Sequence, residues 1–155
     1  MTDRKKDPII EETTNQLRGI VQPYLGRKDF GNLRIVPDKD QFPRDPYGLG
    51  HLQWEVFFES FGCSTSSISI TYDHSSGSWG VSPEIPKGVF NLYGSRETAI
   101  RAFEEKVQEI PLIRREIIIQ RGGDLEKTLR PGVSLRDVYS DEEIRLIEEM
   151  NRIQH

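Results

Sequence analysis

The spacing of apolar residues changes along the chain from a helical period to a two-residue alternation and back. Over residues 8–25 apolar side chains recur close to every 3.6 positions, which predicts an amphipathic helix. Pro8 suits its first turn and Gly26 its end. A short strand is expected at 33–36. The three prolines and two glycines of residues 37–50 then predict a loop.

The middle of the chain alternates apolar and polar residues, as a half-buried strand does. The longest such run is 51–61, and shorter runs follow at 67–73 and 78–82, separated by turn residues. The apolar face of the first run is formed by Leu52, Trp54, Val56 and Phe58. With the strand at 33–36, these runs predict a four-stranded antiparallel meander that is apolar on one face.

Helical periods return after a second proline-containing stretch, 83–94, which predicts another loop. Ser95 is suited to cap a helix over 95–109. Pro111 can open a helix over 110–120, although the apolar run 117–119 could instead form a strand.

A last helix is expected from Ser140, because Glu143 stands at capping-box spacing from it. Its apolar residues face inward or towards another copy of the chain. They are Ile144, Ile147, Met150 and Ile153.

These elements predict an α+β fold: an N-terminal helix, a four-stranded antiparallel β-meander, and two to three C-terminal helices packed on one face of the sheet. We expect one domain over 1–155, with 1–7 as a flexible tail. The element order resembles the ubiquitin-conjugating fold and its inactive relatives. The His-Pro-Asn motif and the cysteine that follow the fourth strand in that family are absent, and Cys63 precedes the third strand. We therefore carry no residue over from that family.

Composition and charge reduce the number of possible functions. The net charge of −4 provides no general attraction to phosphate or to anionic lipid. No apolar run is long enough to span a bilayer. A single cysteine excludes an internal disulfide and a thiolate zinc site. We expect a cytoplasmic protein without a cofactor, for which membrane binding is not expected and nucleic acid is disfavoured.

Histidine and aspartate side chains, which can act in catalysis or metal binding, are predicted to gather at one end of the sheet. The meander brings His51, the loop residues Asp38 and Asp40, and the turn residues Asp73 and His74 towards the same end. Two imidazoles with carboxylates can bind a divalent metal or act as acid and base, as in a small hydrolase. The preferred interpretation is that these are ordinary turn residues, which bind backbone groups locally.

The opposite face of the 51–61 strand suggests a surface for a protein partner. Phe57 lies there between Glu55 and Glu59, with Phe61 in the same register. Such aromatics are covered by the N-terminal helix or the 37–50 loop, are turned to the other face by a bulge that reverses the register, or bind a partner. Aromatic residues of the two loops extend the surface: Phe42, Tyr47, Phe90 and Tyr93.

The preferred function is therefore a non-enzymatic protein-binding or regulatory module: an inhibitor or immunity-type protein, a chaperone-like partner, or a small subunit of a larger complex. A homo-oligomer through the last helix is an added possibility. The first alternative is the small hydrolase or metal-dependent enzyme described above. The second is a nucleic-acid accessory protein that uses basic residues of the C-terminal part. These are Arg114, Arg115, Arg121, Lys127 and Arg130.

Overall fold

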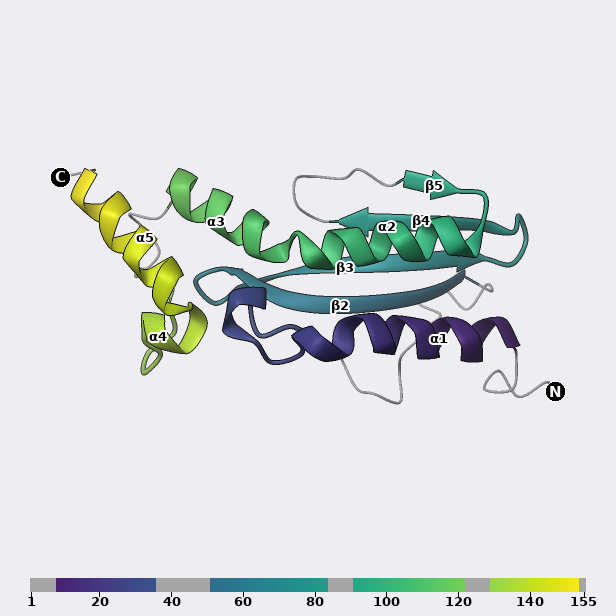
Figure 1. The fold of residues 1–155 in the computed structure, drawn as a ribbon, viewed down its shortest axis with the longest axis horizontal. Coiled ribbons are helices and arrows are strands. Elements are labelled where there is room, and N and C mark those ends of the chain that lie inside the picture. The colour runs from purple at the N-terminus through teal and green to yellow at the C-terminus, as the bar shows by residue number, and fades with distance from the viewer. Residues whose placement is uncertain (1–7, 36–50, 84–90, 122–128, 154–155) are drawn as a thin grey trace. The chain divides into compact units, whose positions relative to one another are not determined.

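The structure is a computed structural model that describes residues 8–35, 51–83, 91–121 and 129–153 (Figure 1). The predicted tail at 1–7 and the loop at 37–50 lie outside the described residues.

The predicted α+β fold is confirmed, with a sheet in which each strand lies next to its neighbour in sequence. The sheet order is β1-β2-β3-β4-β5. The strands are β1 (Arg34–Ile35), β2 (His51–Phe61), β3 (Ser64–Asp73), β4 (Ser78–Pro83) and β5 (Asn91–Tyr93). β3 pairs antiparallel with β4, and β4 pairs antiparallel with β5. The sheet therefore contains the predicted meander and one further short strand, β5, in a stretch whose prolines predicted a loop.

The described chain forms two compact units. The first comprises residues 1–23, 35–56 and 67–107, and the second comprises 24–34, 57–66 and 108–155.

In the first unit, two helices cover the apolar side of the strands: α1 (Pro8–Val21) and α2 (Arg96–Gln108) (Figure 1). Trp54 is fully buried between them and the sheet, its ring stacks on Trp79 at 6.0 Å, and its Nε1–H donates to Thr14 Oγ1 at 3.0 Å. Arg96 at the start of α2 pairs with Glu12 of α1 at 3.0 Å. The rest of this core comes from residues that the hydrophobic pattern placed inward, among them Leu17, Val21, Ile68, Ile70, Phe103 and Val107.

In the second unit, helices surround the end of β2. These are the short 3₁₀ helix η3 (Lys28–Phe30), α3 (Ile110–Arg121), α4 (Leu135–Val138) and α5 (Asp141–Ile153). A further 3₁₀ helix, η2 (Gln22–Tyr24), spans the point in the sequence where the first unit ends and the second begins. Residues 117–119 are helical, so the alternative of a strand there is wrong. Ile118, Val138, Tyr139 and Ile147 form the buried core of this unit.

Hydrogen bonds at the helix ends follow the sequence signals. The Thr98 N–H donates to Ser95 Oγ at 3.3 Å, so Ser95 caps α2. At the start of α5, the Glu143 N–H donates to Ser140 Oγ at 3.3 Å and the Ser140 N–H donates to Glu143 Oε1 at 3.0 Å. Both predicted caps are confirmed.

Candidate functional site

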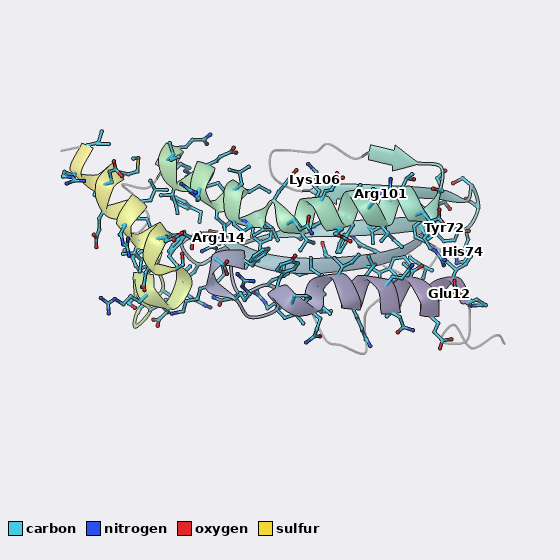
Figure 2. All side chains as sticks on the ribbon, in the orientation of Figure 1. Glu12, Tyr72, His74, Arg101, Lys106 and Arg114 are labelled. Carbon is cyan, nitrogen blue, oxygen red and sulfur yellow. The ribbon has the colours of Figure 1, made fainter. Side chains whose placement is uncertain are left out.

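The turn between β3 and β4 uses its polar groups to hold itself together. The Asp73 carboxylate accepts hydrogen bonds from the Ser75 N–H at 2.9 Å, the Ser75 hydroxyl at 2.7 Å and the Ser76 hydroxyl at 3.0 Å. His74 is exposed, and its ring meets the Tyr72 ring edge-on at 4.8 Å (Figure 2). This matches the interpretation of Asp73 as a turn residue.

The other members of the predicted His/Asp cluster are not placed by the structure. His51 begins β2, but its side chain is outside the described part, as are Asp38 and Asp40. Among the residues that the structure describes, no group of three or more His, Cys, Asp or Glu side chains is arranged to hold a metal ion. The metal or catalytic use of this end of the sheet stays a prediction.

The predicted partner-binding face of β2 is partly covered. Burial alternates regularly along the strand, and Glu55, Phe57 and Glu59 are all half-buried. The Glu59 carboxylate accepts a hydrogen bond from Asn32 Nδ2 at 3.3 Å, and its backbone N–H donates to the Gly31 carbonyl at 2.8 Å. Glu59 is therefore engaged within its own unit.

Phe61 is half-buried, and within the described residues its cover comes from the C-terminal helices rather than from the N-terminal helix, while the 37–50 loop lies outside them. It packs against the core of the second unit, and the Arg121 guanidinium lies 4.2 Å from its ring centroid. Among the loop aromatics, Phe42, Tyr47 and Phe90 fall outside the described residues, and only the backbone of Tyr93 is described, in β5.

Arg114 is buried in the second unit, so it cannot be one of the basic residues that the nucleic-acid alternative requires at the surface. Its exposed fraction is 0%. Nε donates to Glu143 Oε2 at 2.9 Å, and Nη2 donates to Glu143 Oε1 at 3.0 Å and to the Val138 carbonyl at 2.9 Å. Nη1 donates to the Glu59 carbonyl, and the guanidinium lies 4.7 Å from the centroid of the Tyr139 ring. Figure 2 labels Arg114. A buried guanidinium with this many partners fixes the elements that carry them.

Two further interactions hold the segment that precedes α5. The Tyr139 hydroxyl accepts a hydrogen bond from the Gly62 N–H at 2.9 Å, and burial raises the pKa of Tyr139. The Asp137 carboxylate accepts from the Ser134 N–H at 2.8 Å, a bond that lowers the pKa of Asp137. Ser134 and Asp137 have the spacing of a capping box, and this signal for α4 was available in the sequence but not used.

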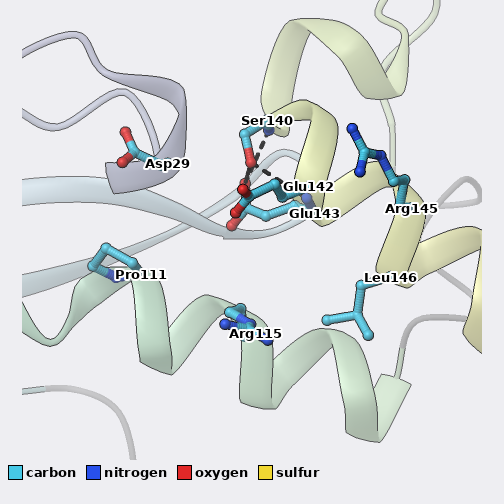
Figure 3. A pocket seen from close by; sticks show the side chains of 8 residues that line it. All are labelled: Asp29, Pro111, Arg115, Ser140, Glu142, Glu143, Arg145 and Leu146. Carbon is cyan, nitrogen blue, oxygen red and sulfur yellow. Dashed lines mark hydrogen bonds between the residues drawn. The ribbon is translucent and has the colours of Figure 1, made fainter.

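A cavity of about 390 Å³ lies between the first turns of α3 and α5 (Figure 3). Pro111 and Arg115 line it from α3, and Glu142, Arg145 and Leu146 line it from α5. The helices contact each other and run side by side in the same general direction (Figure 1). A second cavity of about 570 Å³ shares Asp29, Ser140 and Glu142 with the first and adds Arg27 and Lys28.

The two helices that line this cavity also carry exposed apolar side chains. Among the described residues the exposed large hydrophobic side chains are Leu112 at 57%, Ile119 at 54% and Ile153 at 68%. Leu112 and Ile119 are seven residues apart on α3 and so share one helix face, next to Arg115. Leu146 and Ile153 share one face of α5 in the same way. Pro111, Arg115 and Leu146 line the cavity itself. We use the name α3–α5 groove for these three residues together with the exposed Leu112, Ile119 and Ile153 on the same two helices.

The groove could not be recognised from sequence alone. The apolar pattern of α5 was identified, with its residues facing inward or towards another copy. The structure separates them: Ile147 is buried and Ile153 is exposed. The exposed face of α3 is the one opposite the buried Arg114. The apolar pattern around α3 in the sequence does not indicate that an arginine is buried there.

Of the other basic residues once considered for nucleic acid, Arg121 covers Phe61, Arg115 lines the groove and Arg130 is exposed. Lys127 lies outside the described residues.

Comparison with known proteins identified no matching family model, no matching curated protein and no matching solved structure. A search of the described helices for membrane spans found none that combines the necessary length and apolar character.

Proposed function

We propose that this protein is a cytoplasmic, non-enzymatic protein-binding module whose contact surface is the α3–α5 groove. The observation that carries the proposal is the position of Leu112, Ile119 and Ile153, the exposed large hydrophobic side chains of the described chain, on the two helices of that groove. Exposed apolar side chains that adjoin a cavity and have polar residues at their edges are typical of protein contact sites. Inhibitors, chaperone-like partners and small complex subunits act through such surfaces.

The two helices that form the groove are joined by the buried side chain of Arg114. Arg114 joins α3 to Glu143 of α5 and to the carbonyl of Val138 at the end of α4. Because the walls are fixed before a partner arrives, little conformational entropy is lost on binding. This preorganisation supports the groove as a recognition surface. The half-buried β2 face with Glu55 and Phe57 offers less exposed apolar area.

The proposal is tested by site-specific photo-crosslinking in the cells that make the protein. A photoreactive phenylalanine replaces Ile119, and in a matched control it replaces Arg101, an exposed residue of α2 in the first unit. We expect a crosslinked protein specific to position 119. That protein, once purified, should bind the purified wild-type chain, and Ile119→Asn should weaken this binding at least tenfold.

The assignment of the groove as the contact surface is wrong if positions 119 and 101 crosslink the same proteins equally. It also fails if the purified protein binds wild type and Ile119→Asn with the same affinity. Circular dichroism and an unchanged unfolding midpoint would establish that Ile119→Asn is folded, which is expected because Ile119 is exposed.

A further inference from the structure

We propose that the occupant of the α3–α5 groove is an amphipathic helix of another protein that carries basic residues beside its apolar stripe. This inference rests on the proposed function and specifies the chemistry of the partner.

The spacing of the groove residues matches a helix. The seven residues from Leu112 to Ile119, and from Leu146 to Ile153, each correspond to about 10 Å along a helix axis. An incoming helix with apolar residues at i, i+3 or i+4, and i+7 covers the same length. A partner strand would need free backbone groups along an edge, but both walls are helices whose backbone groups pair internally. The geometry therefore favours a helix over an extended segment.

Acidic residues lie on the solvent side of both apolar stripes. Glu116 adjoins Leu112 and Ile119 on α3, and Glu142 and Glu149 adjoin Leu146 and Ile153 on α5. All three glutamates are exposed. Lysine or arginine beside the apolar stripe of the incoming helix would lie opposite these carboxylates. The net charge of −4 adds attraction for a basic partner over longer distances.

The basic residues near the α3–α5 groove do not outweigh the glutamates beside its apolar stripes. Arg115 and Arg145 line the cavity together with Asp29, Glu142 and Glu143, so both signs are present there. Arg145 and Arg152 lie further round α5 from its apolar stripe than the two glutamates do.

The same charges disfavour a second copy of the chain as the occupant. In an antiparallel pairing of two α5 helices through their apolar stripes, Glu142 and Glu149 of one copy would approach those of the other. Like charges brought together at an interface oppose association. We therefore assign the groove to a helix of opposite charge.

The test uses two designed helical peptides with the same leucine stripe, one flanked by lysine and the other by glutamate. Fluorescence anisotropy measures their binding to the full chain at low and at physiological salt. We expect the lysine peptide to bind at least tenfold more tightly. The difference should shrink as salt rises, because exposed charges are screened. The double variant Glu142→Gln, Glu149→Gln should reduce the preference severalfold. Glu97→Gln on α2 is the matched control, because Glu97 is exposed in the first unit, and it should leave the preference unchanged.

Equal binding of the two peptides, or no binding of either at millimolar concentration, would overturn the basic-helix partner. A dimer seen in sedimentation that dissociates in Ile119→Asn would overturn it in favour of a second copy. These results are distinct from failure of the proposed function: if position 119 crosslinks a specific protein and the peptides fail, the groove binds a partner of another kind.

Discussion

At the scale of single residues, Gly31 is a position where the second unit tolerates little change. Its φ is 64°, in the left-handed region. A Cβ there would lie 2.5 Å from the Glu59 carbonyl oxygen and 2.8 Å from Arg114 Nη1. Neither neighbour can move easily, because one is strand backbone and the other is a buried guanidinium. Gly31 thus allows the η3 turn to approach β2 and Arg114 closely.

We predict that Gly31→Ala lowers the free energy of unfolding by about 3 kcal/mol, because left-handed strain adds to a backbone clash. The matched control is Gly26→Ala. Gly26 has a similar φ of 72° with nothing within 4 Å of its added Cβ, so its cost should be only about 1 kcal/mol. Urea unfolding measures both. Equal losses for the two variants would show that the close approach at Gly31 is not significant.

Two neighbouring threonines of α1 differ in their hydrogen bonding. Thr14 Oγ1 accepts a hydrogen bond from the buried Trp54 Nε1–H, whereas the buried Thr13 Oγ1 has no hydrogen-bond partner among the described residues. Thr13→Val should therefore raise the free energy of unfolding by about 1 kcal/mol, since an unpaired hydroxyl gives way to a methyl group of the same shape. Thr14→Val should lower it by about 1–2 kcal/mol, since the indole N–H loses its acceptor. Thermal unfolding of the two variants decides this, and a shift of the same sign in both would contradict it.

At the scale of elements, the position of α5 depends on one carboxylate with two roles. Glu143 completes the capping box with Ser140 and also pairs with Arg114 of α3. The start of one helix is thereby tied to the buried face of another. This arrangement sets the direction in which Leu146 and Ile153 face, and therefore positions one wall of the groove.

A double-mutant cycle tests this connection between α3 and α5. Arg114→Met should cost about 3–5 kcal/mol, because it leaves the Glu143 carboxylate buried without its cation. Glu143→Gln keeps an oxygen acceptor for the cap and should cost less, about 2 kcal/mol. The double variant should lose clearly less stability than the sum of the two, because no unpaired buried charge remains in it. Additive losses in urea unfolding would mean that the pair does not act as a unit.

At the scale of the whole molecule, charge and exposed apolar area together control self-association. The chain carries 25 acidic and 21 basic residues, and this excess of carboxylates opposes association of the molecules at pH 7. As pH falls into the carboxylate titration range, the net negative charge decreases and the exposed groove becomes the main determinant of solubility.

We expect the solubility of the protein to fall as pH is lowered from 7 towards about 5. Ile119→Gln, which only removes apolar area, should raise solubility at low pH more than Gln120→Glu, which only adds charge at the next exposed position. Precipitation assays across this pH range give the comparison. A larger benefit from Gln120→Glu would show that charge, rather than the groove, controls association.

Elements with a strong local signal were predictable. The two-residue alternation of 51–61 and the serines that cap α2 and α5 led to the observed strand and helix starts. β5 was missed because its three residues follow a proline-containing stretch and are held by pairing with β4 rather than by their own propensity. The partner surface predicted from the sequence lies on the β2 face, whereas the surface proposed from the structure lies on α3 and α5. The difference arises because half-buried residues such as Glu59 are engaged by Asn32, which is distant in sequence.

The sequence by itself determined the order of the longer helices and strands, the apolar faces of α1, β2, β3 and α2, and the caps of two helices, because these follow from the spacing of neighbouring residues. Only the tertiary structure decided that Arg114 is buried and that Leu112, Ile119 and Ile153 are exposed. The physical reason is that burial of a charge depends on partners brought together from separate segments. For Arg114 these partners are Glu59, Val138 and Glu143, and no local pattern records that they converge.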